Sequence, residues 1–370
     1  MQKNWDCLGL MSGSSGDGVD ASIIRTNGTN QYEIIKDKYF EYDQTIYKDI
    51  HNLKDKISNI HQLKLFENEI KDLERKITIF HAEVIKSLNL SDETIVGFHG
   101  QTIYHNYEEK ISKQLGNGTL LKQLTNKRIV YDFRSNDILN GGQGAPLTPI
   151  FHHLISFQNN FKLPICFLNI GGISNLTIIN DRNNLTKLIS KDIGPGNCLI
   201  DTWVRKNSDK KFDKDGKLAL IGKKNQIIFE QALELFSNSK NKKKLSFDTN
   251  DFDVSFVRGL NLADGVATLT DFTASIISEE LSLCFNDSKS KINQILLCGG
   301  GRKNKVLVEL IKKKLPKNIN LKLIDDYKIN GDFVESQAFA YLALRSILNL
   351  PLSFPSTTGC IEPTLGGKHI

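Results

Sequence analysis

The stretch Gly9-Leu10-Met11-Ser12-Gly13-Ser14-Ser15-Gly16-Asp17-Gly18-Val19-Asp20 lies near the start of the chain, with apolar residues on both sides. This layout predicts a strand, a tight turn and a second strand. Glycine lets backbone N–H groups approach a ligand closely, and converging N–H groups form a nest for anions, usually phosphate. Asp17 and Asp20 would repel a phosphate directly, so they favour a hydrated magnesium ion between carboxylate and phosphate. The alternative is a Gly/Ser-rich hairpin without a ligand, because short glycine motifs have many false positives.

The bulk composition is typical of a soluble globular protein with more than one domain. A chain of 370 residues is too long for one simple core and predicts two domains. Its 39% hydrophobic and 24% charged residues are ordinary for a globular protein. No apolar run approaches the roughly 18 residues that a membrane helix needs. The N-terminus shows no apolar signal segment, so we expect a cytoplasmic protein with no membrane partner.

The cysteines and the net charge exclude two further classes of protein. The 6 cysteines are scattered without a C-x-x-C pair, which predicts reduced, buried thiols and no zinc site. The net charge of +6 comes mainly from lysine on helix faces, as in residues 242–244 and 312–314. Because no aromatic residues are interleaved with these lysines, we expect no nucleic-acid partner and only a mild attraction for anionic ligands.

Strand and helix patterns alternate along most of the chain. Apolar residues recur at helical spacing from Ile50 to Leu88, which predicts one long or two consecutive amphipathic helices. Thr94–Phe98 predicts a buried strand that delivers residues 99–105 to its C-terminal end, and residues 128–132 predict another strand. Further helical patterns cover residues 148–157, 226–237, 262–284, 303–314 and 333–348. This alternation predicts a mainly parallel or mixed sheet with helices on both faces and ligand loops at the carboxyl ends of strands.

A second strand–turn–strand unit repeats the pattern of the first. Residues 165–170 form the predicted strand, Gly171-Gly172-Ile173-Ser174 the turn, and residues 176–179 the return strand. The match is one of pattern and not of identity. Two later loops also favour close backbone approach: Asp192-Ile193-Gly194-Pro195-Gly196-Asn197, and Gly299-Gly300-Gly301 after a buried strand at residues 294–298.

Taken in order, these motifs resemble those of the anhydro-N-acetylmuramic acid kinase family. The matching segments run from residue 9 to about residue 367, so the likeness covers nearly the whole chain. They are residues 9–20, 98–105, 132–137, 141–149, 169–175, 192–197, 299–301, 335–340 and 354–359. The chain departs from the family pattern at Ser14 and Ile193, where threonine is usual, and near Leu245, where a lysine is usual. Ser14 keeps a hydroxyl, and the other two departures bear on local contacts.

The resemblance implies an α/β fold of the actin-like, ribonuclease H-like ATPase class. In this fold two domains flank a deep interdomain cleft, and each contributes one phosphate-facing hairpin. We expect domain I to comprise residues 1–134 plus 350–370, with the first hairpin and part of the sugar site. Domain II is expected over residues 135–349, with the second hairpin, the catalytic aspartate and the adenosine site. A homodimer is also what the family suggests.

The implied reaction converts 1,6-anhydro-N-acetylmuramic acid, ATP and water into N-acetylmuramic acid 6-phosphate and ADP, in the recycling of peptidoglycan. Because O6 of this sugar is tied to C1, water must attack C1 while the released O6 attacks the γ-phosphorus. The family's general base matches Asp192. From the residues alone, an aspartate that caps a turn is the alternative for this position.

The resemblance also places the two substrates. The expected contacts to ATP come from the glycine loops: Gly13, Ser14, Ser15, Gly16, Asp17, Gly18, Val19, Asp20, Gly171, Gly172, Ser174, Gly299, Gly300 and Gly301. Asp17 and Asp20 would orient a hydrated Mg²⁺ through water. For Gly299–Gly301, an ordinary strand-to-helix turn is an equally good explanation.

The expected contacts to the sugar are His99, Gln101, Thr102, Arg134 and Glu335. Arg134 could bind the lactyl carboxylate through two parallel hydrogen bonds, or form an ion pair with Asp132 or Asp137. Glu335 begins a predicted helix, where the helix dipole also stabilises a carboxylate. His99 and His105 lack a third ligand at suitable spacing for a metal, which favours hydrogen-bonding or core histidines.

Two other functions fit the same motifs. One is another actin-like sugar kinase, in which Asp192 deprotonates a free sugar hydroxyl. The other is a regulator that binds nucleotide without turnover, although the full set of glycine loops together with Asp192 argues against it.

Overall fold

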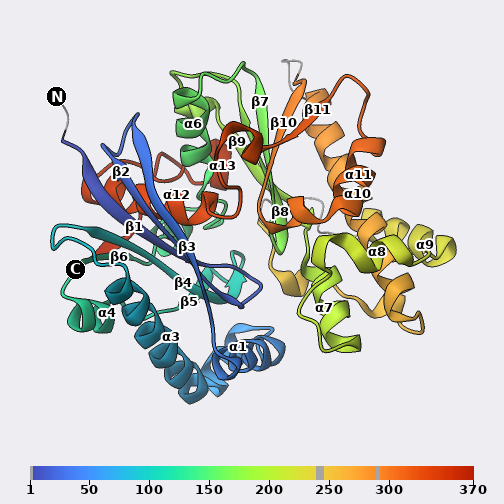
Figure 1. The fold of residues 1–370 in the computed structure, drawn as a ribbon, viewed down its shortest axis with the longest axis horizontal. Helices are drawn as coiled ribbons and strands as arrows, with labels where there is room; N and C mark the ends of the chain where they lie inside the picture. The colour runs from blue at the N-terminus through green and yellow to red at the C-terminus, as the bar shows by residue number, and fades with distance from the viewer. Residues whose placement is uncertain (1–2, 239–245, 288–291) are drawn as a thin grey trace. The chain divides into compact units, whose positions relative to one another are not determined.

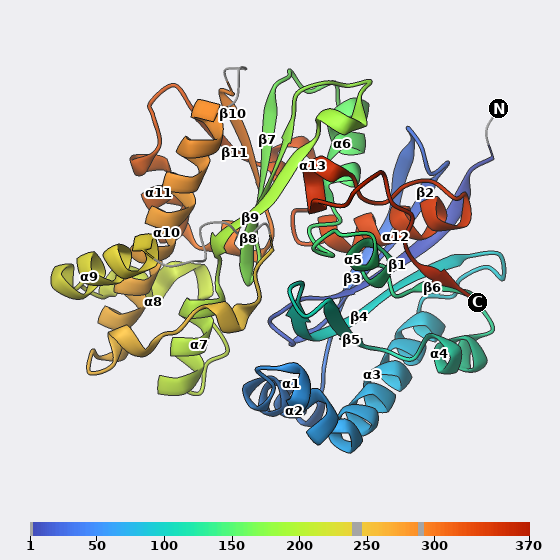
Figure 2. The ribbon, with the colours of Figure 1, turned by 180° about the vertical axis from the view of Figure 1, so that it is seen from behind.

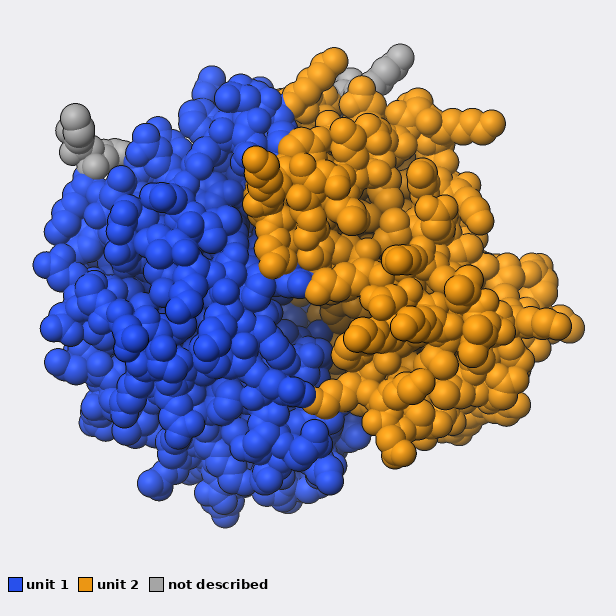
Figure 3. All heavy atoms as spheres, in the orientation of Figure 1, with its two compact units in different colours: residues 1–161, 182–189, 332–370 blue, residues 162–181, 190–331 orange. Residues whose placement is uncertain are grey.

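The computed structural model describes residues 3–238, 246–287 and 292–370 (Figure 1). The chain divides into two compact units, drawn in blue and orange in Figure 3. Unit 1 comprises residues 1–161, 182–189 and 332–370, and unit 2 comprises residues 162–181 and 190–331. The expected domain boundaries lie elsewhere, after residue 134 and before residue 350, and the division of roles between the domains stays a prediction. Leu245 and Lys242–Lys244 lie outside the described residues.

Unit 1 is built on a seven-stranded sheet. Its strands, in spatial order, are β12 (Lys368–His369), β6 (Arg128–Tyr131), β4 (Ile95–Asn106), β1 (Trp5–Ser12), β2 (Gly18–Thr26) and β3 (Tyr32–Glu41), with β5 (Ile111–Leu115) paired to β4. Strands β1, β2 and β3 form an antiparallel meander, while β4 runs parallel to β1, and β6 runs parallel to β4. The predicted first glycine hairpin is therefore the turn between β1 and β2.

Alternate residues of β1 serve the two faces of this sheet, as the pleat of a strand requires. Leu8 and Leu10 join a buried apolar core with α1 (Gln44–Lys56) and α3 (Glu67–Ser87). Gly9 faces α12 (Val334–Ile347), where a Cβ would lie 1.8 Å from the carbonyl oxygen of Ser336. The missing side chain lets α12 lie directly on the sheet, with its first turn toward the carboxyl ends of β1 and β4 (Figures 1 and 2).

Unit 2 has a five-stranded sheet. Its strands, in spatial order, are β11 (Asn320–Leu323), β10 (Gln294–Cys298), β7 (Ile165–Ile170), β8 (Ile173–Ile179) and β9 (Ile189–Pro195). Its helices are α7 (Cys198–Asn207), α8 (Lys217–Ile221), α9 (Gln226–Asn238), α10 (Leu262–Asp287) and α11 (Lys305–Lys314). Apolar residues of α10 and α11 pack on β7, β8 and β10 to form the core of this unit.

The two sheets share one topology. Five strands of each sheet follow the same order: β3, β2, β1, β4 and β6 in unit 1, and β9, β8, β7, β10 and β11 in unit 2. In both units the second strand is antiparallel to the first (β2 to β1, β8 to β7), and β4 and β10 run parallel to β1 and β7. This arrangement is the ribonuclease H-like α/β unit that the actin-like fold contains twice. The predicted fold class and the two predicted glycine hairpins are thus confirmed.

Three details differ from the prediction. The helical stretch from Ile50 to Leu88 is broken, because Asn59 caps a separate short helix α2 (Ile60–Leu65) between α1 and α3. Residues 99–105 do not follow the end of a strand but continue β4, since β5 supplies them with an antiparallel partner. Asp192 lies within strand β9 and not in a loop.

The remaining helices of unit 1 lie between and after these strands. They are α4 (Gly118–Thr125), α5 (Ser135–Leu139), α6 (Pro149–Gln158) and α13 (Pro355–Thr358). Among the helices in the described ranges, none combines the length and the apolar character needed to cross a membrane.

Candidate active site

The first glycine loop, residues 13–17, leaves the carboxyl end of β1, and side chains from other elements hold its carbonyl groups. Gln101 Nε2 of β4 donates to the Gly13 carbonyl at 2.9 Å. Lys54 Nζ of α1 donates to the Ser14 carbonyl, also at 2.9 Å. Two elements far apart in the sequence therefore fix the same turn.

The second half of this loop is held in the same way. His51 Nε2 of α1 donates to the Ser15 carbonyl at 3.0 Å, and the Tyr39 hydroxyl of β3 donates to the Asp17 carbonyl at 2.9 Å. Carbonyl oxygens repel phosphate oxygens, whereas backbone N–H groups attract them. A loop whose carbonyls are bound to donors of the surrounding protein is therefore suited to an anion.

A buried polar cluster anchors the strand end from which the loop starts. Ser12 Oγ lies 2.8 Å from the Tyr42 hydroxyl and 3.4 Å from His81 Nε2. Burial lowers the pKa of His81 to about 4, against the opposing effect of a hydrogen bond to the Ile77 carbonyl. His81 is therefore a neutral structural histidine near neutral pH, and the cluster fixes the residue that precedes Gly13.

The side-chain amide of Gln101 has a hydrogen-bond partner for its nitrogen but none for its oxygen. The side chain is fully buried, and Nε2 binds the Gly13 carbonyl, but Oε1 has no hydrogen-bond partner. A buried acceptor without a donor costs about 1–3 kcal/mol, so it calls for a donor that arrives with a ligand or a water molecule. The structure thus leaves a buried acceptor without a donor in the middle of β4.

His99 and Arg134 form a closely coupled pair in unit 1. Arg134 Nε and Nη2 lie 3.2 and 2.9 Å from His99 Nε2, and Nη1 donates to the Gly144 carbonyl at 2.7 Å. His99 Nδ1 lies 2.7 Å from the Gly100 carbonyl, which fixes the proton on that nitrogen. Burial, followed by the charge of Arg134, holds the pKa of His99 well below its usual value.

The two aspartates considered as ion-pair partners of Arg134 have structural roles of their own. Asp132 forms an ion pair with Lys368 at 2.8 Å, and Asp137 accepts the Gly144 N–H at 2.7 Å. Asp137 thus holds the glycine-rich loop whose carbonyl at residue 144 binds Arg134. The carboxylate acts on the arginine through the loop.

The other predicted sugar contacts lie in the same unit. Thr102 Oγ1 accepts a hydrogen bond from Gln114 Nε2 of β5 at 3.2 Å. Glu335 lies half-buried in the first turn of α12. Because α12 rests on the sheet through Gly9, this turn lies toward the carboxyl ends of β1 and β4.

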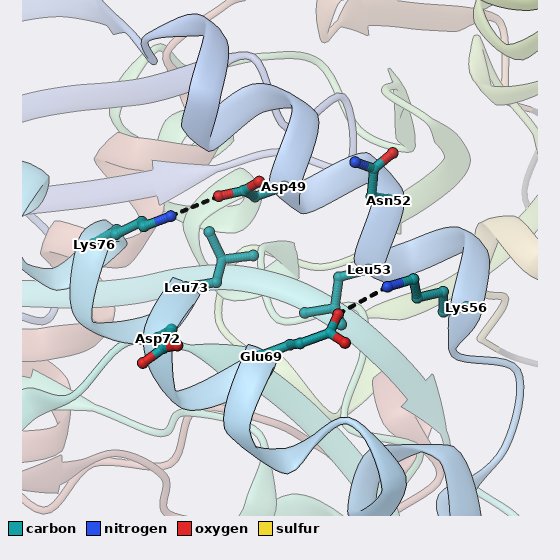
Figure 4. Close-up of a pocket in the computed structure, with 8 residues that line it drawn as sticks. All are labelled: Asp49, Asn52, Leu53, Lys56, Glu69, Asp72, Leu73 and Lys76. Carbon is teal, nitrogen blue, oxygen red and sulfur yellow. Dashed lines mark hydrogen bonds and ion pairs between the residues drawn. The ribbon is translucent and has the colours of Figure 1, made fainter.

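A surface groove between α1 and α3 lies in the same unit but contains none of the predicted site residues (Figure 4). Ion pairs span it from Lys56 to Glu69 at 2.9 Å and from Lys76 to Asp49 at 2.8 Å. Exposed pairs of this kind contribute about 0–1 kcal/mol each. They hold α1 beside α3, and α1 in turn carries two of the four side chains that bind the first glycine loop.

The second glycine turn, at the end of β7 in unit 2, is held by backbone and not by side chains. The N–H groups of Gly196 and Cys198 donate to the Gly172 carbonyl at 2.9 and 3.1 Å, and the N–H of Asn197 donates to the Gly171 carbonyl at 2.8 Å. The turn is thus bound to the segment that ends β9 and begins α7.

This backbone contact is too close for any side chain. A Cβ at Gly196 would lie 2.3 Å from the Gly171 carbonyl oxygen. Ser174 Oγ adds a hydrogen bond to the Pro195 carbonyl at 3.2 Å. Two of the predicted glycine-containing segments of unit 2, the hairpin turn and residues 192–197, therefore form one rigid piece.

Asp192 lies on this rigid piece. Its side chain is only 6% exposed, and its Oδ2 accepts the backbone N–H of Phe247 at 2.8 Å. Two residues further on, Gly194 has φ +141°, where a Cβ would meet the Ile276 side chain at 2.6 Å. The carboxylate is fixed in direction by a backbone donor and lies close to the turn of the second hairpin.

The third glycine loop follows β10, which is parallel to β7. Gly299 and Gly301 pack against the end of β7, where added Cβ atoms would lie 2.4 Å from Asn169 Oδ1 and 2.2 Å from Ile170 Cγ2. The buried Arg302 closes the loop: its Nη1 donates to the Gly299 carbonyl at 3.0 Å, and its Nε donates to Asp325 at 2.7 Å.

The glycines of these loops fall into two groups. Gly299 and Gly301 are required by packing, as shown above. At Gly13 and Gly171 an added Cβ would meet nothing closer than 3.7 and 3.5 Å, and at Gly300 nothing within 4 Å. None of these last three residues has a positive φ. The packing of the fold therefore does not explain why these three positions are glycine.

Within residues 3–238, 246–287 and 292–370, no group of three or more His, Cys, Asp or Glu side chains is arranged to hold a metal ion. Asp17 Oδ1 accepts the Ser15 hydroxyl at 2.6 Å, and Asp20 follows in β2. Carboxylate oxygens such as those of Asp17 and Asp20 are the ligands that hydrated Mg²⁺ takes in proteins, where it keeps several of its waters.

The predicted site residues are divided between the units. Unit 1 contains residues 13–20, His99, Gln101, Thr102, Arg134 and Glu335, and unit 2 contains Asp192, Gly171, Gly172, Ser174, Gly299, Gly300 and Gly301. Sequence reasoning missed Tyr39, His51, Lys54, Phe247 and Arg302, and it considered Asp137 only as an ion-pair partner of Arg134. Only Arg302, directly after three glycines, had a local signal.

Comparison with known proteins agrees with the motifs. The family model described as anhydro-N-acetylmuramic acid kinase matches residues 6–369. A protein of Pelagibacter ubique with that name is 56% identical, over 99% of this chain and 98% of its own. One from Agrobacterium fabrum, with the same name, is 36% identical, over 97% of each chain.

Among solved structures, the activator of the 2-hydroxyisocaproyl-CoA dehydratase from Clostridium difficile with bound ADPNP matches at a TM-score of 0.41 and 11% identity, over 93% of this chain and 96% of its own. A likeness at that level carries no argument, whereas the family model and the two relatives cover nearly the whole chain. This chain belongs to the anhydro-N-acetylmuramic acid kinase family.

Proposed function

We propose that this protein is an ATP-dependent kinase that converts 1,6-anhydro-N-acetylmuramic acid and water into N-acetylmuramic acid 6-phosphate, in the recycling of cell-wall sugars. The family supports this activity over nearly the full chain. The observation that carries it is the buried carboxylate of Asp192, which Phe247 N–H orients on the segment bound to the second glycine turn.

The reaction requires one base and one site for phosphate. Asp192 removes a proton from water as the water oxygen bonds to C1, and the C1–O6 bond breaks. The released O6 then bonds to the γ-phosphorus, and the bond between that phosphorus and the oxygen bridging to the β-phosphate breaks to release ADP. A base of this kind typically contributes roughly 10²–10⁴-fold to the rate.

The glycines unexplained by packing support the placement of ATP. Gly13 would bring backbone N–H groups to the terminal phosphates, together with Ser14, Ser15, Gly16, Gly18 and Val19. Gly171, Gly172 and Ser174 would contact the phosphates from the second hairpin, and Gly300 the adenosine. Asp17 and Asp20 would hold Mg²⁺ through water, and that ion would neutralise phosphate charge when bound.

The orphaned oxygen of Gln101 supports the placement of the sugar. A sugar hydroxyl or the N-acetyl N–H would supply the missing donor to Oε1. Arg134 would bind the lactyl carboxylate, while Thr102 and Glu335 would contact the ring. A cytoplasmic location and a homodimer belong to this proposal as well.

A coupled assay of ADP release tests the proposed function. We expect release only when 1,6-anhydro-N-acetylmuramic acid is present, with the phosphate located on O6 by NMR. Glucose and N-acetylglucosamine serve as free-hydroxyl controls, because turnover of either in place of the anhydro sugar would identify a different sugar kinase. ATP binding without ADP release in any arm would identify a regulator and contradict the proposal.

A further inference from the structure

His99 was expected to contact the sugar, and in the structure both of its ring nitrogens have partners within the protein. It is 5% exposed, and both ring nitrogens are engaged within the protein, Nδ1 by the Gly100 carbonyl and Nε2 by Arg134. Its ring also packs against Phe339 of α12, with centroids 4.5 Å apart. Because both ring nitrogens and the ring itself have contacts, His99 is suited to holding a neighbouring side chain in one orientation.

The neighbour it fixes is the guanidinium of Arg134. With its proton on Nδ1, neutral His99 presents the lone pair of Nε2 to two N–H donors of Arg134, while the Gly144 carbonyl accepts from Nη1. An unrestrained arginine side chain loses rotamer entropy when it binds a carboxylate, and that loss weakens binding. Two acceptors of fixed position remove much of that cost before the ligand arrives.

His105 adds to the same arrangement from the far end of β4. Its Nδ1 lies 2.8 Å from Ser112 Oγ. Burial, followed by the charge of Arg134, lowers the pKa of His105 to about 3, against the opposing effect of a hydrogen bond that the ring donates to the Gln143 backbone. Both histidines beside Arg134 are therefore neutral near neutral pH and add no positive charge next to its guanidinium.

We propose that His99 is a positioning residue for Arg134, which it holds ready to bind the carboxylate of the sugar substrate. This inference rests on the proposed function and deepens it, because it assigns discrimination between sugars with and without a lactyl carboxylate to a buried pair. His99 itself does not touch the substrate.

The test compares His99→Phe with His99→Gln on two sugars. Phenylalanine keeps the ring beside Phe339 but has no acceptor, whereas the glutamine Oε1 can replace Nε2 as acceptor. For 1,6-anhydro-N-acetylmuramic acid we expect H99F to raise KM by roughly 10- to 100-fold, the loss of a hydrogen bond to a charged group, with little change in kcat. H99Q should recover most of the loss.

With 1,6-anhydro-N-acetylglucosamine, which lacks the carboxylate, H99F and the wild type should have the same KM. The matched control is His152→Phe, another buried histidine of unit 1, which should leave both KM values unchanged. An equal rise in KM for both sugars, or no rise for either, would overturn the proposal.

A measurement on the wild-type protein covers the case in which H99F fails to fold. Nitrogen NMR should show His99 as the neutral Nδ1–H tautomer at pH 7, with a hydrogen-bonded Arg134 Nε–H that exchanges slowly with solvent. A proton on Nε2, or a freely exchanging Arg134 Nε–H, would overturn the positioning role by itself. Absence of ADP release from wild type with either sugar would instead contradict the proposed function.

Discussion

The two glycine hairpins occupy the same place in two sheets of the same topology, yet they are held by different means. Side chains from α1, β3 and β4 bind the carbonyls of the first loop. Backbone N–H groups of residues 196–198 bind the carbonyls of the second turn. The first loop therefore depends on several separable contacts, whereas the second is continuous with the strand that carries Asp192.

The difference has a physical consequence. A side-chain hydrogen bond can be removed singly, at a net cost of about 0.5–1.5 kcal/mol, and the other contacts remain. A Cβ at Gly196 would lie 2.3 Å from the Gly171 carbonyl oxygen. A side chain at Gly196 would therefore disrupt all of the backbone hydrogen bonds of the second turn together. Substitutions should accordingly act by small steps in the first hairpin and abruptly in the second.

The largest expected effect is that low pH lowers the free energy of unfolding much more in unit 1 than in unit 2. Burial lowers the pKa of His81 to about 4 and those of His105 and His152 to about 3 in unit 1, while unit 2 contains no histidine. Because the unfolded chain binds protons at its ordinary histidine pKa of about 6.5, each of these groups should cost roughly 1.4 kcal/mol of unfolding free energy per pH unit below that value.

Hydrogen exchange at pH 7 and at pH 5 measures this effect, after correction for the intrinsic exchange rate. Between pH 7 and pH 5, the opening free energy of β1 and β4 should fall by several kcal/mol. The opening free energy of β7 and β10 should fall far less. An equal fall in both units would contradict the comparison.

The next effect concerns the carboxylate on the rigid piece of unit 2. Asp192→Asn should lower kcat by roughly 10²–10⁴-fold, since an amide cannot accept the proton of water. The melting temperature should stay close to that of wild type, because the amide oxygen still accepts the Phe247 N–H. Turnover within about tenfold of wild type would remove Asp192 from the role of base.

Gly196→Ala should disrupt the backbone hydrogen bonds that hold the second hairpin. The added Cβ meets a carbonyl oxygen, and overpacking of this kind costs about 1–3 kcal/mol of stability. We expect a lower melting temperature together with reduced kcat, because the segment bearing Asp192 must move. Gly171→Ala is the matched variant, since its Cβ has ordinary space. Gly171→Ala should leave the stability unchanged and raise only the KM for ATP. Equal melting temperatures for the two variants would contradict the idea that the backbone contacts of Gly196 hold the second hairpin.

The smallest effects should come from the first hairpin. Lys54→Met removes one of its donors and should raise the KM for ATP by about fivefold, equivalent to ~1 kcal/mol, with an unchanged KM for the sugar. Lys56→Met, two residues along α1 in an exposed ion pair with Glu69, is the control and should leave both constants alone. A loss of more than about 100-fold from Lys54→Met would show that the first hairpin is no more separable than the second.

Much of this arrangement could be predicted from the sequence, because short-range patterns encode it. The two glycine hairpins, strand β10 and helices α9 to α12 followed from apolar periodicity and glycine spacing. The break at Asn59 was missed because the apolar spacing continues across it, and the continuation of β4 was missed because its partner β5 has only a short, polar pattern.

The contacts that orient the site could not be predicted locally. Phe247 reaches Asp192 across 55 positions and Gln101 reaches Gly13 across 88, so neither pair leaves a mark in the sequence nearby. The engagement of both nitrogens of His99 also depended on the fold, because Arg134 lies in another element.

The central claim is that water attacks C1 of the anhydro sugar while O6 accepts the phosphoryl group, with Asp192 as base. The most direct test runs the reaction in water enriched with oxygen-18 and stops it before the product sugar exchanges its anomeric oxygen. The account predicts the label on C1 of N-acetylmuramic acid 6-phosphate and none in the phosphate ester. An unlabelled C1, or label in the ester oxygen, would contradict it.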